Sequence, residues 1–422
     1  MRRFLHLANR IFNLKEGLIL ILISFLVLLS RLFYFRWFIR SLGGHEYYDI
    51  AQNISAGFGY VGSGFFHLNY APTSFLPPVY TYLFALSLKL FGKIPGHIMM
   101  IIFQAIISVF IVIFIYKLGE EIFDKKSAAI ACVIFLIYLP FIHWTTKVWD
   151  TMLFTFLLLA ICLLTYRFRE KNYYNNLILL GILIGICALT NAVTLIVIPF
   201  IMLYFLYNWK ERISKSIFKI TILIFAILLT VLPWTIRNYY VHKAMIPIRT
   251  GLWPNLYLGN NPVATGTVYL KENGKVSKDF EKGITMHFRP MIEDLRNLSE
   301  IEQERYFKDK FLNFAKHNPA TFISLVFKKI YLFWWFNPYE VSNIAWRIEY
   351  FLLLYFASLG ILFSKIHKKR ISFLLLIFLS FTMVYSLTGP FFNWKYRLPI
   401  EPYLMILAGF GIKNLFSLIK RD

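Results

Sequence analysis

Long apolar stretches alternate with short polar segments along most of the chain. A stretch of about twenty apolar residues has the length that an α-helix needs to cross the hydrocarbon core of a bilayer. The pattern therefore predicts an all-α polytopic membrane protein with about ten transmembrane helices. The predicted spans lie at residues 17–38, 97–116, 127–143, 151–167, 175–189, 191–208, 217–234, 347–364, 371–388 and 401–418.

The stretch from Pro77 to Gly92 is also apolar, but it is short, begins with two prolines and carries Lys89. Its placement decides on which side every later loop falls. If it crosses the membrane, the basic loops 117–126 and 167–171 lie outside. If it stays on the outer surface, every short basic loop and both termini lie in the cytoplasm. Because short cytoplasmic loops carry the excess of lysine and arginine, we predict a juxtamembrane helix that does not cross.

Two outer segments are long, at residues 39–96 and 235–346. The sequence therefore predicts three parts. Residues 1–234 form a transmembrane module that contains the first outer loop at 39–96, residues 235–346 form a long extracytoplasmic loop, and residues 347–422 form the last transmembrane helices. The basic start leads into the first span without a small-residue cleavage site, so we expect that span to be a signal anchor.

Composition supports a membrane protein and narrows its partners. The chain is 58% hydrophobic and 16% charged, with a mean hydropathy of +0.59. A net charge of +23 could suggest nucleic acid, but most of the positive charge lies in short loops that face an anionic leaflet. We expect membrane lipids as partners and no nucleic acid. The three cysteines lie inside apolar runs, so they predict neither a disulfide nor a metal site.

Ionisable and polar residues from distant parts of the chain fall at one level, the outer ends of the predicted spans. Ionisable groups near membrane depth are costly and are generally functional. Carboxylates there could take a proton from an acceptor hydroxyl or amine, and arginine or lysine could hold a phosphate that becomes the leaving group. The residues at this level are Glu46, Asp49, Asp150, Arg237, Asn238, Lys395, Arg397 and Glu401.

Each of these residues also has a structural interpretation. Glu46 could favour the first turn of a helix, Asp150 could cap the span that follows it, and the cations could snorkel to lipid headgroups. Composition does not separate a transferase from a lipid or solute transporter. A transporter is expected to show inverted repeats or helices broken at the bilayer midplane, and the sequence shows neither.

Five blocks in order give the chain a family resemblance. They are YYDIAQNISAGFGY, FLPPVYTYLFALSLKLFG, VLPWTIRNYYVHKAMIPI, NLYLGNNPVATG and YRLPIEPYLMILAGFGI. Together they resemble the integral membrane glycosyltransferases of the GT-C class, in particular the bacterial protein O-mannosyltransferase and aminoarabinose lipid A transferase group. The resemblance implies a hexosyl or pentosyl transferase in the cytoplasmic membrane of a prokaryote. It implies a polyprenyl-phosphate-linked sugar as donor and an extracytoplasmic lipid, glycan or protein as acceptor.

The resemblance also implies which residues are catalytic. The aspartate that the family usually carries in the first outer loop falls here at Gly44 and His45, and the nearest acid is Glu46. The base is therefore open among Glu46, His45 and Asp49, with Glu46 as the first choice. The family's second acid, more often a glutamate, corresponds to Asp150.

The expected ligand contacts follow from the same comparison. We expect Arg397 to contact the donor phosphate with help from Lys395 or Arg237, because a guanidinium can pair two phosphate oxygens. Tyr48, Tyr60 and Asn260 lie in the matched blocks and are expected to bind substrate. No cofactor is firmly predicted, and a divalent metal is left open. The changed catalytic position leaves a catalytically silent scaffold as an alternative beside the transporter.

Overall fold

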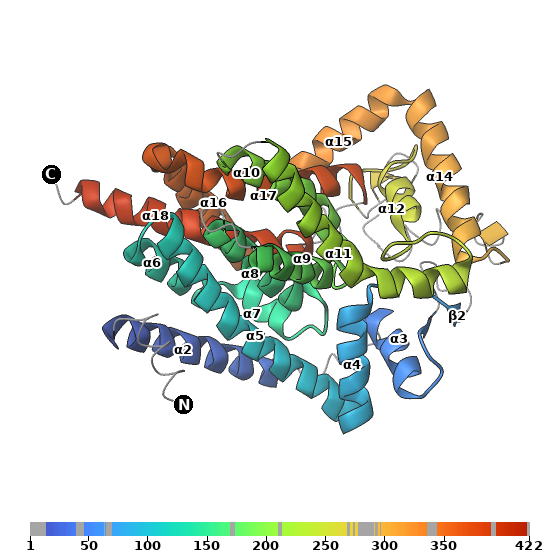
Figure 1. Cartoon of the computed structure of the whole chain (residues 1–422), viewed down its shortest axis with the longest axis horizontal. Coiled ribbons are helices and arrows are strands. Elements are labelled where there is room, and N and C mark those ends of the chain that lie inside the picture. Colours follow the sequence, from blue (N-terminus) through green and yellow to red (C-terminus); the bar gives the residue numbers. More distant parts are fainter. Residues whose placement is uncertain are drawn as a thin grey trace.

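The computed structural model of the chain is built mainly of helices (Figure 1). It describes residues 14–38, 46–62, 64, 70–168, 174–209, 213–267, 271–272, 275–276, 291, 294–295, 297–335, 344–389 and 394–419.

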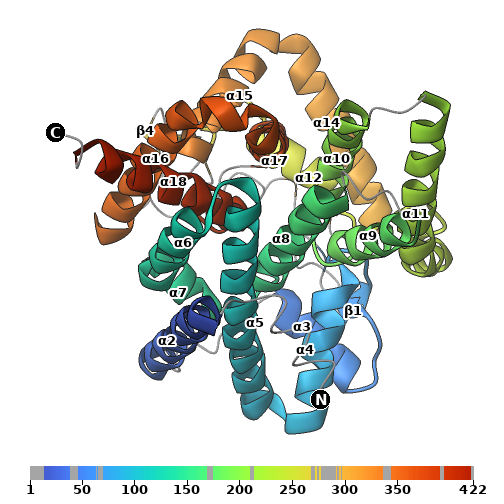
Figure 2. The same cartoon turned by 60° about the vertical axis from the view of Figure 1, so that its left-hand side comes forward.

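A bundle of apolar helices forms the larger part of the molecule (Figures 1 and 2). Each predicted span coincides with one of these helices or, in one case, with a pair of them. The helices are α2 (Leu14–Phe38), α5 (Lys93–Ile122), α6 (Lys125–Ile137), α7 (Leu139–Thr145), α8 (Thr151–Phe168), α9 (Tyr174–Ala188), α10 (Thr194–Asn208), α11 (Ile213–His242), α16 (Ile344–Phe363), α17 (Lys368–Leu387) and α18 (Glu401–Ile419).

The prediction of a multi-pass membrane protein is confirmed. Six helices within the described ranges are long and apolar enough to cross a membrane, and the α6–α7 pair would make a seventh. The apolar part of α2, together with α9 and α10, is shorter. The number of ten crossings therefore stays a prediction.

The predicted span at 127–143 is not one straight helix, because α6 and α7 meet at a bend of 59°. Tyr138 between them has an extended backbone, and Pro140 follows in the first turn of α7. A proline lacks an N–H group and fits the first turn of a helix, where that group needs no partner within the helix. The chain thus ends one helix and starts another at this point.

Charged side chains from two other helices complete the hydrogen bonding at this bend. Arg31 of α2 donates to the carbonyl oxygens of Phe135 and Leu136, each at 3.1 Å. The backbone N–H of Leu139 donates to Glu349 Oε2 of α16 at 3.0 Å. Irregular backbone at membrane depth is tolerated where protein groups form hydrogen bonds with its free N–H and C=O groups. The packing of the bundle therefore stabilises the bend.

Helix α18 lies between α6 and α16 (Figure 2). Glycines allow the backbones of these helices to touch, as small residues do between transmembrane helices. A Cβ atom on Gly360 of α16 would meet the carbonyl of Leu407, and one on Gly409 of α18 would meet the carbonyl of Ser127 on α6. The close packing holds α18 in place, and with it the segment before the helix that carries Lys395 and Arg397.

The predicted outer segments form a second layer of shorter elements. Figure 1 shows α3, α4, α12 and α14 at the end of the molecule opposite to the carboxyl end of α18. The elements are α3 (Glu46–Ser55), α4 (Pro78–Phe91), α12 (Leu252–Gly259), α14 (Glu300–His317) and α15 (Pro319–Trp334), with the antiparallel strand pairs β1 (Val61–Gly62) with β2 (Ala71–Pro72) and β3 (Lys271–Glu272) with β4 (Lys275–Val276).

Two carboxylates at the start of α14 bind the outer segments, and one of them, Glu300, joins the first segment to the second. Glu300 accepts from Thr73 Oγ1 of the first outer loop at 2.9 Å and also from the hydroxyl of Thr250. Glu304 accepts from the backbone N–H of Trp253 at 3.2 Å. An acid near a helix amino terminus is favoured by the helix dipole, so these contacts suit α14 and hold both segments in one layer.

Candidate functional site

Helix α3 brings the first outer loop against the bundle. Its apolar face, which includes Tyr47, Ile50 and Ala51, is buried and packs on α4. The ring of Tyr47 lies edge-on to those of Tyr80 and Trp149, with centroids 5.1 and 5.3 Å apart. Glu46 is the first residue of α3 and is half-buried. His45 lies outside the described residues.

Asp150 lies just before α8 and is only 4% exposed. Its Oδ2 accepts a hydrogen bond of 2.8 Å from Asn191 Nδ2, and its side chain is also hydrogen-bonded to that of Tyr47. Burial raises the pKa of Asp150 to about 6, although the hydrogen bond from Asn191 and the charge of Lys395 lower it. A carboxyl with such a pKa changes charge close to neutral pH.

A glutamine in the middle of α5 fixes the turn that carries Asp150. Gln104 is fully buried, and its Nε2 donates to the carbonyls of Thr145 and Lys147 at 2.8 and 3.0 Å. Its Oε1 accepts from Tyr80 at 3.0 Å. Gln104 is not among the residues expected from the sequence, where its signal is a single amide inside an apolar span.

Lys395 reaches the same place from the segment before α18. Its Nζ lies 3.8 Å from the centroid of the Trp149 ring, a cation–π distance. Burial lowers the pKa of Lys395 to about 8, while the carboxylates of Glu46 and Asp150 oppose that shift. The structure thus brings together three residues that the sequence placed only at one level: Glu46, Asp150 and Lys395.

Arg249 was missed by the sequence reasoning. Its charge lowers the pKa of Asp150 and of Lys395, so it lies within electrostatic reach of both. It stands one residue beyond the matched block that ends at Ile248.

Arg397 is held by protein groups. It is 1% exposed, and its Nε pairs with Glu401 Oε1 at 2.8 Å. One terminal nitrogen donates to the carbonyl of Phe333 at 2.8 Å, and the guanidinium carbon lies 3.4 Å from the centroid of the Tyr350 ring. The last carbonyls of a helix lack partners within it, so Arg397 completes the carboxyl end of α15.

Arg237 of α11 fastens the first outer loop. One terminal nitrogen donates to the carbonyl of Thr73 at 2.6 Å and the other to the carbonyl of Tyr60 at 3.1 Å. Its guanidinium carbon also lies 4.8 Å from the centroid of the Trp234 ring. The contacts of this arginine hold two parts of the loop on the bundle.

The structure places the three expected substrate residues in packed positions. The ring of Tyr48 lies 4.7 Å from that of His97, centroid to centroid, on the side of α3 that faces α4 and α5. The hydroxyl of Tyr60 donates to the carbonyl of Leu76 at 2.8 Å. Asn260 is fully buried and accepts from Lys329 Nζ at 2.8 Å. Direct contact with substrate stays a prediction for all three.

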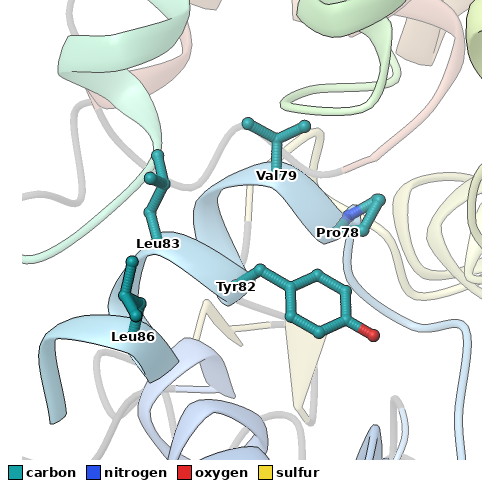
Figure 3. A pocket seen from close by; sticks show the side chains of 5 residues that line it. All are labelled: Pro78, Val79, Tyr82, Leu83 and Leu86. Carbon is teal, nitrogen blue, oxygen red and sulfur yellow. The ribbon is translucent and has the colours of Figure 1, made fainter. Parts of the chain in front are cut away.

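An apolar groove runs along α4. It has a volume of about 380 Å³ and is lined by Pro78, Val79, Tyr82, Leu83 and Leu86. Figure 3 shows these side chains along one side of the helix. The backbone N–H of Val79 donates to the carbonyl of Leu189 at 3.0 Å, two residues before Asn191. The groove therefore begins beside the turn that holds Asp150.

The described residues contain no group of three or more histidine, cysteine, aspartate and glutamate side chains that could hold a metal ion. The chemistry that the site offers is that of two carboxylates, two cations and an apolar surface.

A sequence comparison finds one family that matches part of the chain. The sequence profile of the dolichyl-phosphate-mannose-protein mannosyltransferase family matches residues 76–235, which include Asp150, Asn191 and the groove. No curated protein sequence matches the chain.

Solved structures match nearly the whole fold. The oligosaccharyltransferase of Archaeoglobus fulgidus in the apo form has a TM-score of 0.59 at 14% identity, and the match covers 95% of this chain and 50% of that one. AglB from the same organism, in complex with an inhibitory peptide and a dolichol-phosphate, has a TM-score of 0.59 at 15% identity over 96% and 50% of the two chains.

ArnT from Cupriavidus metallidurans bound to undecaprenyl phosphate has a TM-score of 0.51 at 13% identity, with 93% of this chain and 60% of that one covered. The chain thus spans about half the length of the archaeal proteins.

Proposed function

The chain has the fold of the GT-C membrane glycosyltransferases, and on that premise we propose that it transfers a sugar from a polyprenyl-phosphate-linked donor to an acceptor on the extracytoplasmic face of a prokaryotic cytoplasmic membrane. The observation that carries the proposal is the meeting of Asp150, Glu46 and Lys395 beside the apolar groove of α4. A lipid phosphate has an anionic head and an apolar tail, so it fits such a combination.

The groove supports the lipid part of this substrate. Its five lining residues are apolar or aromatic, and an open groove of this kind suits an extended hydrocarbon chain. Prenyl units there would exchange the apolar interior of the bilayer for an equally apolar protein surface, so the groove suits the tail without adding a hydrophobic driving force. The phosphate would then lie near the Asp150 turn, within reach of Lys395.

The reaction would be a displacement at the anomeric carbon. A hydroxyl or amine of the acceptor forms the new bond to that carbon, and the bond from the carbon to the phosphate oxygen breaks. The oxygen leaves with the electron pair as polyprenyl phosphate, stabilised by nearby cations. The acceptor proton passes to a carboxylate, and we assign that role to Glu46 because its charge acts on Lys395 and its side chain is less buried than that of Asp150.

Asp150 has a different part in this proposal. It is nearly inaccessible and already bound by Asn191, so it orients Lys395 and the acceptor rather than taking the proton. His45 and Asp49 remain the alternative bases. A hexosyl or pentosyl group as the transferred sugar, and a lipid, glycan or protein as the acceptor, are both compatible with this arrangement.

The base is tested by Glu46→Gln, which keeps the shape of the side chain and removes the charge. Loss of a positioned base costs about a hundredfold to ten-thousandfold in rate, so we expect a loss of this size in kcat. The acceptor and the sugar are first identified from the glycans and lipids that change in a deletion strain, measured by mass spectrometry.

Asp49→Asn, on the same helix, is the matched control and should retain activity within a few-fold. A fully active Glu46→Gln enzyme beside an inactive Asp49→Asn or His45→Ala enzyme would move the base to that neighbour. If all three folded variants keep full activity, the first outer loop does not supply the base.

The bend between α6 and α7 is the one observation that favours a transporter, because broken helices line many transport sites. Here Arg31 and Glu349 satisfy the freed backbone groups. The bend thus needs no solute to complete it. Movement of a polyprenyl phosphate across proteoliposomes without an acceptor would support the transporter instead.

A further inference from the structure

We propose that Arg249 binds the phosphate of the lipid-linked substrate through its two terminal nitrogens, on a backbone strip that the protein holds rigid for this purpose. The inference rests on the proposed transfer function, and it names the residue that recognises the phosphate of the donor lipid. The sequence led us to expect Arg397, Lys395 or Arg237 in this role, and not Arg249.

The strip at residues 246–251 is fastened from several sides. Trp234 Nε1 donates to the carbonyl of Ile248 at 2.7 Å, and Asn238 Nδ2 donates to the same carbonyl at 3.2 Å. The backbone N–H of Thr250 donates to the carbonyl of Ser74 at 3.0 Å. The strip is therefore bound both to α11 and to the first outer loop, on either side of Arg249.

The Arg249 side chain is oriented as well. Its Nε donates to the carbonyl of Thr250 at 2.9 Å, and its guanidinium carbon lies 5.0 Å from the centroid of the Phe75 ring. Its two terminal nitrogens make no hydrogen bond to any residue that the structure describes. A guanidinium fixed in this way presents a planar pair of donors, the geometry that binds phosphate through two parallel hydrogen bonds.

Of the three cations expected for this role, two make other contacts and the third has a less suitable geometry. Arg237 uses both terminal nitrogens on backbone carbonyls of the first outer loop. Arg397 pairs with Glu401 and closes the end of α15. Lys395 is in the site, but an ammonium lacks the two-pronged geometry of a guanidinium.

The charges around the site support an anion between Arg249 and Lys395. The positive charge of Arg249 contributes to the lowered pKa of Lys395 and to that of Asp150. Two neighbouring cations that repel each other are both stabilised when a phosphate binds between them. A bound phosphate would therefore hold Lys395 charged.

The test measures binding of undecaprenyl phosphate and of undecaprenol to the purified full chain in nanodiscs. The parent protein should prefer the phosphate. Arg249→Gln should lose about tenfold to a hundredfold in affinity for the phosphate, as expected for a lost charge-assisted hydrogen bond, and bind the alcohol unchanged. Arg249→Lys keeps the charge but not the fork, so it should fall between them. Lys243→Gln, an exposed cation that follows α11, is the control and should bind as the parent does.

Each outcome decides a different point. A parent protein with no preference for the phosphate contradicts both the transfer function and this inference. A preference that survives in Arg249→Gln and Arg249→Lys overturns the inference and leaves the function standing. Inorganic phosphate lacks the tail and should compete only weakly; equal competition would make the ligand a free phosphate. If Arg249→Gln does not fold, the result for Arg249→Lys decides alone.

Discussion

At the residue scale, two ionisable groups govern the charge of the site. Asp150 is buried with Asn191 as its hydrogen-bond donor, and Lys395 lies on the ring of Trp149. Burial opposes the charged form of each, while each stabilises the charge of the other. The pKa of Asp150 rises to about 6 and that of Lys395 falls to about 8. Asp150 is therefore charged above about pH 6 and Lys395 below about pH 8, so the two are charged together only between these values.

This arrangement predicts a bell-shaped dependence of kcat/KM on pH. Activity should rise through about pH 6 as Asp150 loses its proton and fall through about pH 8 as Lys395 loses its own. The two values belong to the interacting pair. Asp150→Asn should remove the acidic limb. Lys395→Arg should move the alkaline limb upward, since an arginine stays charged. A pH profile unchanged in both variants would show that neither group controls turnover.

At the element scale, the bend between α6 and α7 depends on side chains of other helices. Arg31 on α2 supplies donors to two carbonyls at the end of α6, and Glu349 on α16 accepts from the start of α7. Hydropathy gave no sign of this break, because the residues on both sides of it are equally apolar. A proline at position 140 was the available local signal.

Removing the guanidinium at the bend should destabilise the bundle. Arg31→Met leaves the carbonyls of Phe135 and Leu136 without these donors, and a buried unsatisfied group costs about 1–3 kcal/mol. We expect a lower unfolding midpoint in detergent, measured by intrinsic fluorescence on heating. Arg167→Met, at the exposed end of α8, is the matched control and should leave the midpoint unchanged. Equal midpoints for both variants would mean that the bend does not depend on Arg31.

At the scale of the whole molecule, the predicted topology puts the outer layer and the site on one side of the membrane. In intact cells, Met245→Cys in the outer layer should react with an impermeant maleimide, since Met245 is 78% exposed. Lys125→Cys and Lys369→Cys should react only after permeabilisation. The three native cysteines are fully buried and give little background. Labelling of Lys125→Cys from outside would instead require an additional crossing, such as one by α4.

The sequence by itself determined where the helices lie and which residues share a level. Hydropathy and the length of an apolar run are local properties, so each predicted span coincided with helical structure, and Glu46, Asp150 and Lys395 were all placed near the outer surface. The family blocks added the fold class. The contacts of Tyr48 already needed more, because only the packing of α3 shows that its ring meets His97 while that of Tyr47 meets Trp149.

Only the tertiary structure decided which polar groups are paired with one another. Nothing local in the sequence separates Arg237, Arg249 and Arg397. Arg237 and Arg397 donate to backbone carbonyls far along the chain, whereas Arg249 donates through Nε to the carbonyl of its neighbour Thr250. Partner choice depends on which helices lie side by side, and that is set by packing between residues distant in sequence. The level of a residue in the membrane is therefore readable from the chain, whereas its partners are not.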